Sequence, residues 1–215
     1  MKILFLHSNF PAQFRHLAVN LAKNADNRIV FGTTRKEGQI PGVYKLIYTP
    51  SREPKRETHH YIKPLESAVL HGQAVYRELN KLKKDGFYPE IVYGHSGWGP
   101  TMFIKDVFPR SKLLCYFEWF GKSENSVFDF GGENLSLEQK EKIKCNNSHV
   151  LMDLCNCDAG ITPTYWQRDQ FPHEFHHKIK VLHDGVDTNI CKPDSNAKIF
   201  INDLNLELRA DDEII

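Results

Sequence analysis

Histidine, carboxylate and tryptophan side chains follow short apolar runs at several places in this 215-residue sequence. The clearest place is the segment Pro89–Pro100, in which strand-forming Ile91–Tyr93 lead into His95 and a loop rich in glycine. We expect this strand to present His95 at a binding edge of the fold. A tight turn between a strand and a helix, with an incidental histidine, is the alternative interpretation.

Five loops of this kind carry most of the polar and aromatic candidates, including all three tryptophans of the chain. Aromatic rings beside carboxylates, amides and histidines suit sugars, because the ring face stacks on a flat surface and the polar groups bind hydroxyls. The pattern predicts a polyol or carbohydrate ligand. Alternatively, each tryptophan is an ordinary core aromatic below its loop. The loops are Ser8–Gln13, His95–Trp98, Glu118–Phe120, Thr162–Trp166 and His183–Asp187.

Alternating strand and helix patterns would position these loops. Lys2–His7 is nearly continuously apolar, as expected of a strand covered on both faces, and apolar residues recur at helical spacing from Phe14 to Ala22. We therefore expect an α/β fold, with a doubly wound, mostly parallel Rossmann-like sheet and helices on both faces. Ligands of such sheets bind beyond the carboxyl ends of the strands. Further strands are expected at 28–33, 43–48, from Glu90, at 112–117, 158–162 and 178–182, and helices at 64–84, 100–107, 137–155 and 164–171.

Composition restricts the cellular setting. The formal net charge is +1, from 28 Lys and Arg against 27 Asp and Glu, so bulk charge favours neither nucleic acid nor an anionic membrane. No apolar run is long enough for a signal peptide or a membrane span, and the five cysteines are irregularly spaced, as is typical of reduced thiols. We expect a cytoplasmic protein without a transmembrane segment. The basic loop Ser51–Ile62 is either merely solvated or contacts an anionic acceptor or, peripherally, a membrane surface.

Five motifs occur in an order that has a counterpart in a known family. They are Met1–Ala18, Gly94–Gly99, Tyr116–Phe120, Thr162–Arg168 and Val181–Thr188. Through them, about residues 1–190 resemble the amino-terminal, acceptor-side domain of family 4 (group 1) retaining glycosyltransferases of GT-B fold. The Asp-Gly-Val-Asp segment is the most specific part. The resemblance implies transfer of a sugar from a nucleoside-diphosphate sugar to a saccharide or lipid-linked acceptor, with no metal or other cofactor.

The resemblance also implies roles for individual residues. His95 would be the catalytic residue beside the transferred sugar, where it positions and polarises rather than acts as a general base. Glu118 would orient an acceptor hydroxyl, or else cap a helix or loop. The acceptor- and sugar-binding residues would be Trp98, Glu118, Trp119, Tyr165, Trp166, His183, Asp184, Gly185 and Asp187.

A second group of residues would lie on the side of the donor phosphates, near the start of the first helix. Many relatives have paired glycines where this chain has Pro11 and Ala12, and proline removes one backbone donor from a phosphate cradle. Arg15 and His16 either approach phosphate or are ordinary surface residues of that helix. The group consists of Asn9, Phe10, Gln13, Arg15 and His16.

The resemblance divides the chain into an acceptor domain, residues 1–197, and a segment, residues 198–215, that would lead into a donor-binding domain. We expect the chain alone to be inactive and a separate donor-domain polypeptide to be a candidate partner. One alternative is a non-catalytic saccharide- or protein-binding α/β module. Another is a zinc metalloprotease, since His173-Glu174-Phe175-His176-His177 matches H-E-x-x-H, although Pro172 and a strand starting by Ile179 disfavour the long helix such a site needs.

Overall fold

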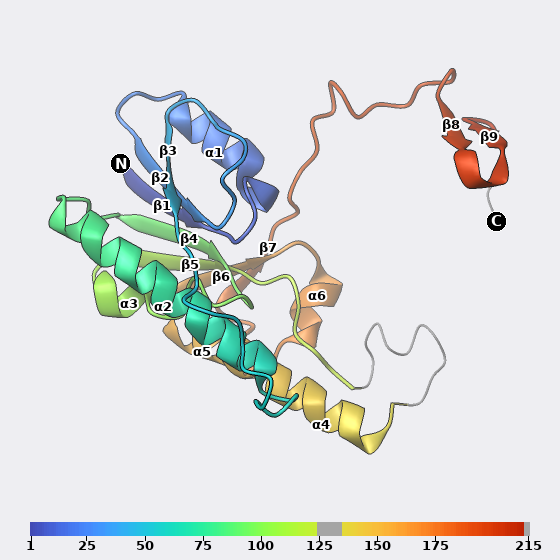
Figure 1. The fold of residues 1–215 in the computed structure, drawn as a ribbon. Helices are drawn as coiled ribbons and strands as arrows, with labels where there is room; N and C mark the ends of the chain where they lie inside the picture. Colours follow the sequence, from blue (N-terminus) through green and yellow to red (C-terminus); the bar gives the residue numbers. More distant parts are fainter. Residues whose placement is uncertain (124–134, 213–215) are drawn as a thin grey trace. The chain divides into compact units, whose positions relative to one another are not determined.

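The computed structural model describes residues 1–123 and 135–212, in which seven parallel strands form one sheet (Figure 1). The strand order is β3-β2-β1-β4-β5-β6-β7. The chain thus moves outward from β1 to one edge and then, from β4, outward to the other edge. This confirms the expected doubly wound Rossmann-like fold. The strands are β1 Lys2–Leu6, β2 Arg28–Thr33, β3 Val43–Ile47, β4 Ile91–His95, β5 Lys112–Tyr116, β6 Ala159–Thr162 and β7 Ile179–Val181.

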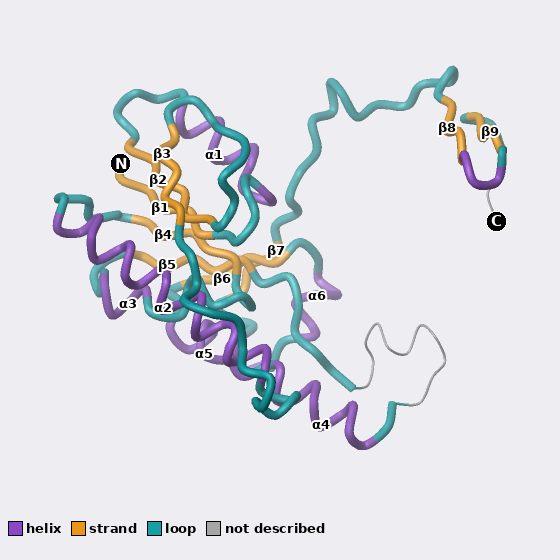
Figure 2. The backbone as a smooth tube through the Cα atoms, in the orientation of Figure 1, coloured by secondary structure: helices purple, strands orange, loops and turns teal. Residues whose placement is uncertain are grey.

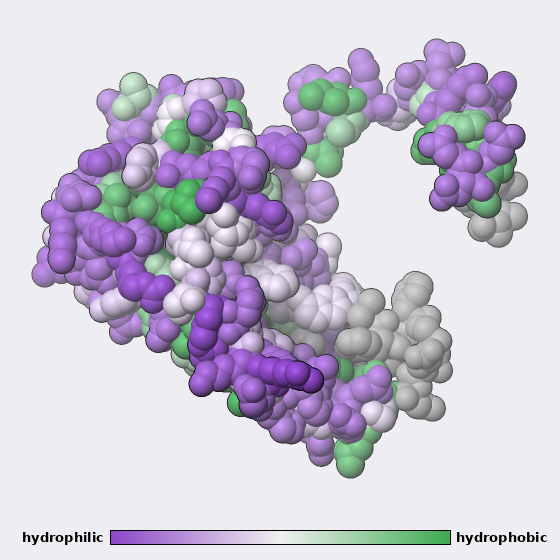
Figure 3. Space-filling view, in the orientation of Figure 1, coloured by the Kyte–Doolittle hydropathy of each residue, from purple (hydrophilic) through white to green (hydrophobic). Residues whose placement is uncertain are grey.

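Helices cover both faces of the sheet. Helices α2, α3 and α5 pack on one face and α1 on the other (Figures 1 and 2). The side of α2 turned away from the sheet carries exposed Arg77, Lys81 and Lys84, and this face is largely hydrophilic in Figure 3. The helices are α1 Arg15–Ala22, α2 Lys63–Lys84, α3 Ile104–Val107, α4 Leu137–Asn146, α5 Ser148–Asn156 and α6 Tyr165–Gln170.

The central strand shows why the sheet needs both helical layers. Successive side chains of a strand point to opposite faces. In β1, Leu4 and Leu6 join the core under α2, α3 and α5, whereas Ile3 and Phe5 join the core under α1. A strand with both faces buried reads as a continuous apolar run, which is the pattern of Lys2–Leu6.

Two expected helices differ in the structure. The segment expected as one helix at 137–155 is two helices, α4 and α5, because Asn147 at their junction binds the backbone of Gly121. Its Oδ1 accepts from the Gly121 N–H at 2.9 Å and its Nδ2 donates to the Gly121 carbonyl at 2.8 Å. Of the helix expected at 100–107, only Ile104–Val107 is α-helical. At the junction of α4 and α5, the contact joins segments far apart in sequence.

The chain forms two compact units, residues 1–183 and 184–215, and each is described by itself. The second unit contains an antiparallel hairpin of β8, Lys198–Ile201, and β9, Leu206–Arg209. Its last three residues, 213–215, lie outside the described part of the chain. The boundary between the units lies within the predicted acceptor domain of residues 1–197. None of the described helices combines the length and apolar character needed to span a bilayer.

Candidate functional site

The site begins where the sheet changes direction, between β1 and β4. The carboxyl ends of two such strands flank the crevice in which ligands of open parallel sheets bind. His95 is the last residue of β4 and His7 follows β1 directly, and their ring centroids lie 4.6 Å apart. Both side chains are almost fully buried. The structure therefore pairs His95 with a second histidine, which the sequence interpretation had treated only as the end of a strand.

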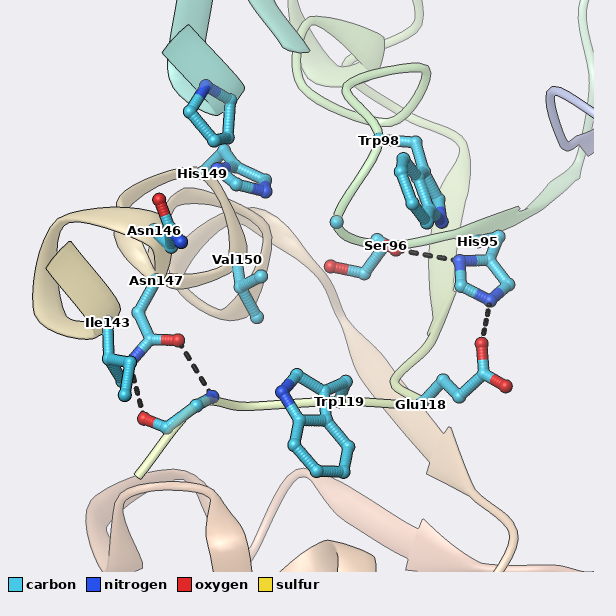
Figure 4. A pocket seen from close by; sticks show the side chains of 13 residues that line it. His95, Ser96, Trp98, Glu118, Trp119, Ile143, Asn146, Asn147, His149 and Val150 are labelled. Carbon is cyan, nitrogen blue, oxygen red and sulfur yellow. Dashed lines mark hydrogen bonds and ion pairs between the residues drawn. The ribbon is translucent and has the colours of Figure 1, made fainter. Parts of the chain in front are cut away.

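Both ring nitrogens of His95 face protein groups (Figure 4). Nδ1 lies 2.7 Å from the carbonyl oxygen of Ser96, and Nε2 lies 3.0 Å from Oε2 of Glu118. Carbonyl and carboxylate oxygens both accept hydrogen bonds, so each ring nitrogen of His95 faces an acceptor. The hydrogen bond with His95 and the nearby imidazoles lower the pKa of the Glu118 carboxyl group despite its partial burial. The pair thus presents an ionised carboxylate beside an imidazole.

Two pockets meet at this pair. The first, which we call the α5 pocket, has a volume of about 300 Å³ and reaches the junction of α4 and α5. The second, the β1 pocket, has a volume of about 270 Å³ and reaches the loop after β1. His95, Trp98 and Glu118 line both pockets, so the histidine–carboxylate pair stands in their shared wall. A group held in one pocket would meet a group held in the other at His95.

Helix α5 holds the loop that follows β4. The fully buried Asp153 accepts a hydrogen bond from Ser96 Oγ at 2.7 Å. Burial raises the pKa of Asp153 to about 6, although hydrogen bonds from Ser96, Thr101 and the Gly97 backbone oppose this rise. One helical turn earlier, α5 carries the buried side chain of His149. The hydrogen bond of Asp153 therefore fixes the loop from below.

The tryptophans are exposed rather than buried. Trp98, Trp119 and Trp166 expose 57%, 42% and 49% of their surface, so the interpretation of these residues as core aromatics is wrong. Trp98 and Trp119 line the α5 pocket, and the ring centroid of Trp166 lies 6.1 Å from that of Trp119. Tyr165 and Trp166 open helix α6 and line neither pocket. Thus two of the four predicted aromatic residues reach the pockets at the His95–Glu118 pair.

The predicted phosphate-side loop contributes two residues to the β1 pocket, Asn9 and Gln13. The backbone N–H of Asn9 donates to Nδ1 of His7 at 2.8 Å. Pro11 precedes a short 3₁₀ turn, in which Ala12 has a left-handed φ of 46°. That conformation favours glycine, the residue type that the family resemblance implies at this place. The loop therefore keeps a glycine-like backbone shape with an alanine.

The other predicted phosphate-side residues lie elsewhere. Phe10 packs edge-on against Phe31, with a ring-centroid distance of 4.8 Å. Arg15 and His16 are exposed on α1 and line neither pocket. Their interpretation as surface residues of the first helix fits this placement.

The last predicted group falls at the boundary between the two units. His183 is an exposed residue at the end of the first unit. Asp184, Gly185 and Asp187 belong to the second unit, in which the Asp187 carboxylate accepts from the Asn189 N–H at 2.9 Å. Their roles remain the ones that the family resemblance implies.

The burial of His7 predicts that the stability of the fold depends on pH. Burial and the neighbouring His95 lower the pKa of His7 from 6.5 to about 4, while a hydrogen bond with Gln13 opposes the change. Between these pH values the unfolded chain binds a proton that the folded chain does not. The contribution of His7 to stability is therefore absent below about pH 4 and grows by about 3 kcal/mol as the pH rises to 6.5.

Urea unfolding of the wild type and of His7→Gln, measured at several values between pH 4 and 7, should show this gain only in the wild type. His16→Gln, at an exposed position of α1, is the matched control and should keep the wild-type pH dependence. If the free energy of unfolding rises equally with pH in the wild type and in His7→Gln, the prediction is wrong.

A comparison with protein-family models now bears on identity. The model described as "Glycosyl transferase family 4 group" matches residues 25–191, which is more than three quarters of the chain. The chain belongs to this family. No match was found among curated proteins.

Solved structures are similar to this family 4 domain at low sequence identity, and the first of the three below shares its fold. The UDP-glucosyltransferase of Polygonum tinctorium has a TM-score of 0.54 and 7% identity, over 85% of this chain and 51% of that one. The catalytic domain of starch synthase IV from Arabidopsis thaliana has a TM-score of 0.48 and 11% identity, and the match covers 87% of this chain and 52% of that one. The Neisseria meningitidis UDP-GlcNAc 2-epimerase has a TM-score of 0.45 and 11% identity, and the match covers 84% of this chain and 45% of that one. The chain thus spans about half the length of these structures.

The H-E-x-x-H match in this family 4 domain is not a zinc-binding helix. Residues His173–Phe175 form a 3₁₀ turn, so the two outer histidines are not one α-helical turn apart. His177 Nδ1 bonds to the Glu174 carbonyl oxygen at 2.8 Å. Within residues 1–123 and 135–212, no group of three His, Cys, Asp or Glu side chains is arranged to hold a metal ion. The metalloprotease interpretation therefore lacks its structural basis.

Contacts also define the basic loop before α2. Arg52 forms an ion pair with Glu66 of α2 at 2.6 Å, and His60 Nε2 lies 2.9 Å from Oε1 of Glu138 of α4. Tyr61 donates from its hydroxyl to Glu141 at 3.2 Å. The loop thus bridges α2 and α4 beside the α5 pocket, which Pro64 at the start of α2 also lines.

Proposed function

We propose that this domain forms the acceptor-binding half of a retaining glycosyltransferase, which moves a sugar from a nucleoside-diphosphate sugar to a hydroxyl of a saccharide or lipid-linked acceptor. The observation that supports it most is the His95–Glu118 pair in the wall shared by two pockets at the switch point of the sheet. One pocket offers aromatic faces to an acceptor, and the other holds amides and a histidine. The free cysteines of the described chain fit the cytoplasmic setting that we propose for this reaction.

The proposed reaction passes through an oxocarbenium-like state, which needs charge stabilisation and exclusion of water more than a strong protein nucleophile. In this proposal His95 contacts the transferred sugar from the shared wall. Glu118, whose side chain is about half exposed, orients the attacking hydroxyl from the acceptor side. The donor diphosphate lies toward the loop of Asn9 and Gln13, and no metal ion takes part.

The proposal assigns the nucleotide to a second domain, in the same polypeptide or in another. The His95–Glu118 pair would then face the donor across a cleft. The 215-residue chain by itself is accordingly expected to turn over little or no nucleotide-sugar, whereas the assembled protein is active.

The test is a transfer assay with protein isolated from its native source, together with any polypeptide that accompanies it. Radiolabelled UDP-, GDP- and ADP-sugars are offered with saccharide acceptors, and the product is analysed by proton NMR. We expect a glycoside whose anomeric configuration equals that of the donor. An inverted product would overturn the retaining mechanism, and saccharide binding without transfer would favour a non-catalytic binding module.

A further inference from the structure

We propose that the α5 pocket takes an uncharged, hydroxyl-bearing sugar ring, and that His149 and Asn146 form hydrogen bonds with its hydroxyl groups. This inference rests on the proposed function, because it names the chemical class of the acceptor. It gives a role to two residues at the junction of α4 and α5 that lie outside the five sequence motifs.

Two buried polar atoms in the pocket wall point to a ligand. Among the residues that the structure describes, neither Nδ1 of His149 nor Oδ1 of Asn146 has a hydrogen-bond partner. His149 exposes only 7% of its surface, yet it lines the pocket. A buried polar atom left without a partner costs about 1–3 kcal/mol. A bound molecule that supplies the missing partners recovers this free energy.

The chemistry of the two atoms specifies what the ligand must supply. Burial lowers the pKa of His149, so its imidazole is neutral and has one donor and one acceptor nitrogen. Nδ1 of His149 is therefore either the donor or the acceptor, whereas the amide oxygen of Asn146 only accepts. A hydroxyl group both donates and accepts, so hydroxyls can satisfy both atoms. An ionised phosphate or carboxylate group has no hydrogen to donate to the Asn146 oxygen.

The rest of the pocket suits a sugar ring. Figure 4 shows His149 and Asn146 on one side of the pocket, across from Trp98 and His95, with Trp119 bordering the space between them. The indole faces supply flat apolar surface on which a pyranose can stack. At about 300 Å³ the pocket is at the small end for ligand sites, which fits a single sugar unit.

The charges around the pocket disfavour an anionic ring. Apart from its histidines, Glu118 is the only ionisable side chain among the described lining residues. An anion would meet this carboxylate without a lysine or arginine in the lining to offset the repulsion. Arg52, in the loop before α2, is already paired with Glu66. A neutral sugar avoids this electrostatic cost.

The test uses the 15N-labelled 215-residue chain, whose three tryptophans give three indole N–H signals in NMR spectra. Neutral probes are methyl α-D-glucopyranoside and methyl α-D-mannopyranoside, and anionic probes are glucose 6-phosphate and glucuronate. We expect saturable shifts of the Trp98 and Trp119 signals with a neutral glycoside, and binding at least about tenfold weaker for the anions. Trp98→Phe and Trp119→Phe assign the signals.

Two variants test the two hydrogen-bonding atoms. His149→Phe keeps an aromatic ring but removes Nδ1, and Asn146→Ala removes Oδ1; each should raise the Kd of the neutral glycoside about tenfold. His177→Phe, at an exposed histidine outside the pocket, is the matched control and should leave the Kd unchanged. Circular dichroism establishes that each variant is folded, and because Asn146 is less buried than His149, its variant serves if His149→Phe does not fold.

Three results would overturn the inference. They are tighter binding of an anionic probe than of the neutral glycosides, unchanged affinity in both His149→Phe and Asn146→Ala, or no indole shift with either neutral glycoside up to its solubility limit. Different results would overturn the proposed function. Transfer to an anionic acceptor would support the transferase function but contradict the proposal of an uncharged acceptor. Saturable binding of a neutral glycoside without any transfer by the assembled protein would support the uncharged ligand but contradict the transferase function.

Discussion

Replacing His95 by alanine is expected to lower kcat for sugar transfer about 10²- to 10³-fold and to change the KM for the nucleotide-sugar much less. The imidazole stands in the shared wall of the two pockets, where the transferred sugar would pass from donor to acceptor. Contacts of the imidazole and its paired carboxylate with a charge-bearing transition state are expected to be stronger than those with the ground state, so their loss appears mainly in kcat.

The structure explains why neighbouring groups cannot replace this side chain. His95 is oriented at one nitrogen by the Ser96 carbonyl and at the other by Glu118. His7, at a ring-centroid distance of 4.6 Å, is held by the Asn9 N–H at its own Nδ1. Alanine would also leave the Glu118 carboxylate without its imidazole, so the orienting role that we propose for Glu118 would be disturbed at the same time.

A matched control separates chemistry from folding. His71→Ala removes a partly buried histidine of α2 that lines neither pocket, and it should keep kcat within about twofold of the wild type. His95→Gln retains a hydrogen-bonding side chain, so its kcat should lie between those of the wild type and His95→Ala. If His95→Ala is folded by circular dichroism and keeps the wild-type kcat, His95 has no part in the transfer.

The sheet could be predicted from the sequence because its strands are covered on both faces. Continuous apolar runs such as Lys2–Leu6 have few other structural solutions, and the alternation with helices fixes a parallel topology. The same reasoning placed His95 at the carboxyl edge. The position of His7 follows equally from the strand that precedes it, although the sequence pattern shows this residue only as the end of an apolar run.

The junction of α4 and α5 could not be predicted in this way. Its decisive interaction joins Asn147 to the backbone of Gly121, and the side chain that makes it resembles any polar residue of a surface helix. His149 and Asp153 present the same difficulty, since four-residue spacing on a helix is also the pattern of a solvated face. Their burial can be recognised only in the folded structure, in which the loop after β4 packs on them.

That loop leads to the second prediction: Gly99→Ala should destabilise the fold by at least about 3 kcal/mol. Gly99 has a φ of 94°, in a region that alanine rarely adopts, and the loop lies directly on α2. An added Cβ would sit 1.9 Å from the carbonyl oxygen of Ala68 and 2.7 Å from its Cα. These are backbone atoms inside a helix, so relief requires the loop or the helix to move. Because Trp98 is the neighbouring residue, the α5 pocket should be disturbed as well.

Gly86→Ala separates the steric clash from the backbone strain. Gly86 also has a positive φ, 82°, but an added Cβ there meets no atom within 4 Å. Its replacement should cost about 1–2 kcal/mol, the usual penalty for a left-handed alanine. Urea unfolding of both variants should therefore show a clearly larger loss for Gly99→Ala, together with altered tryptophan fluorescence in that variant alone. Equal losses of unfolding free energy in the two variants would mean that the loop after β4 is not packed against α2. The position of Trp98 in the α5 pocket would then also be wrong.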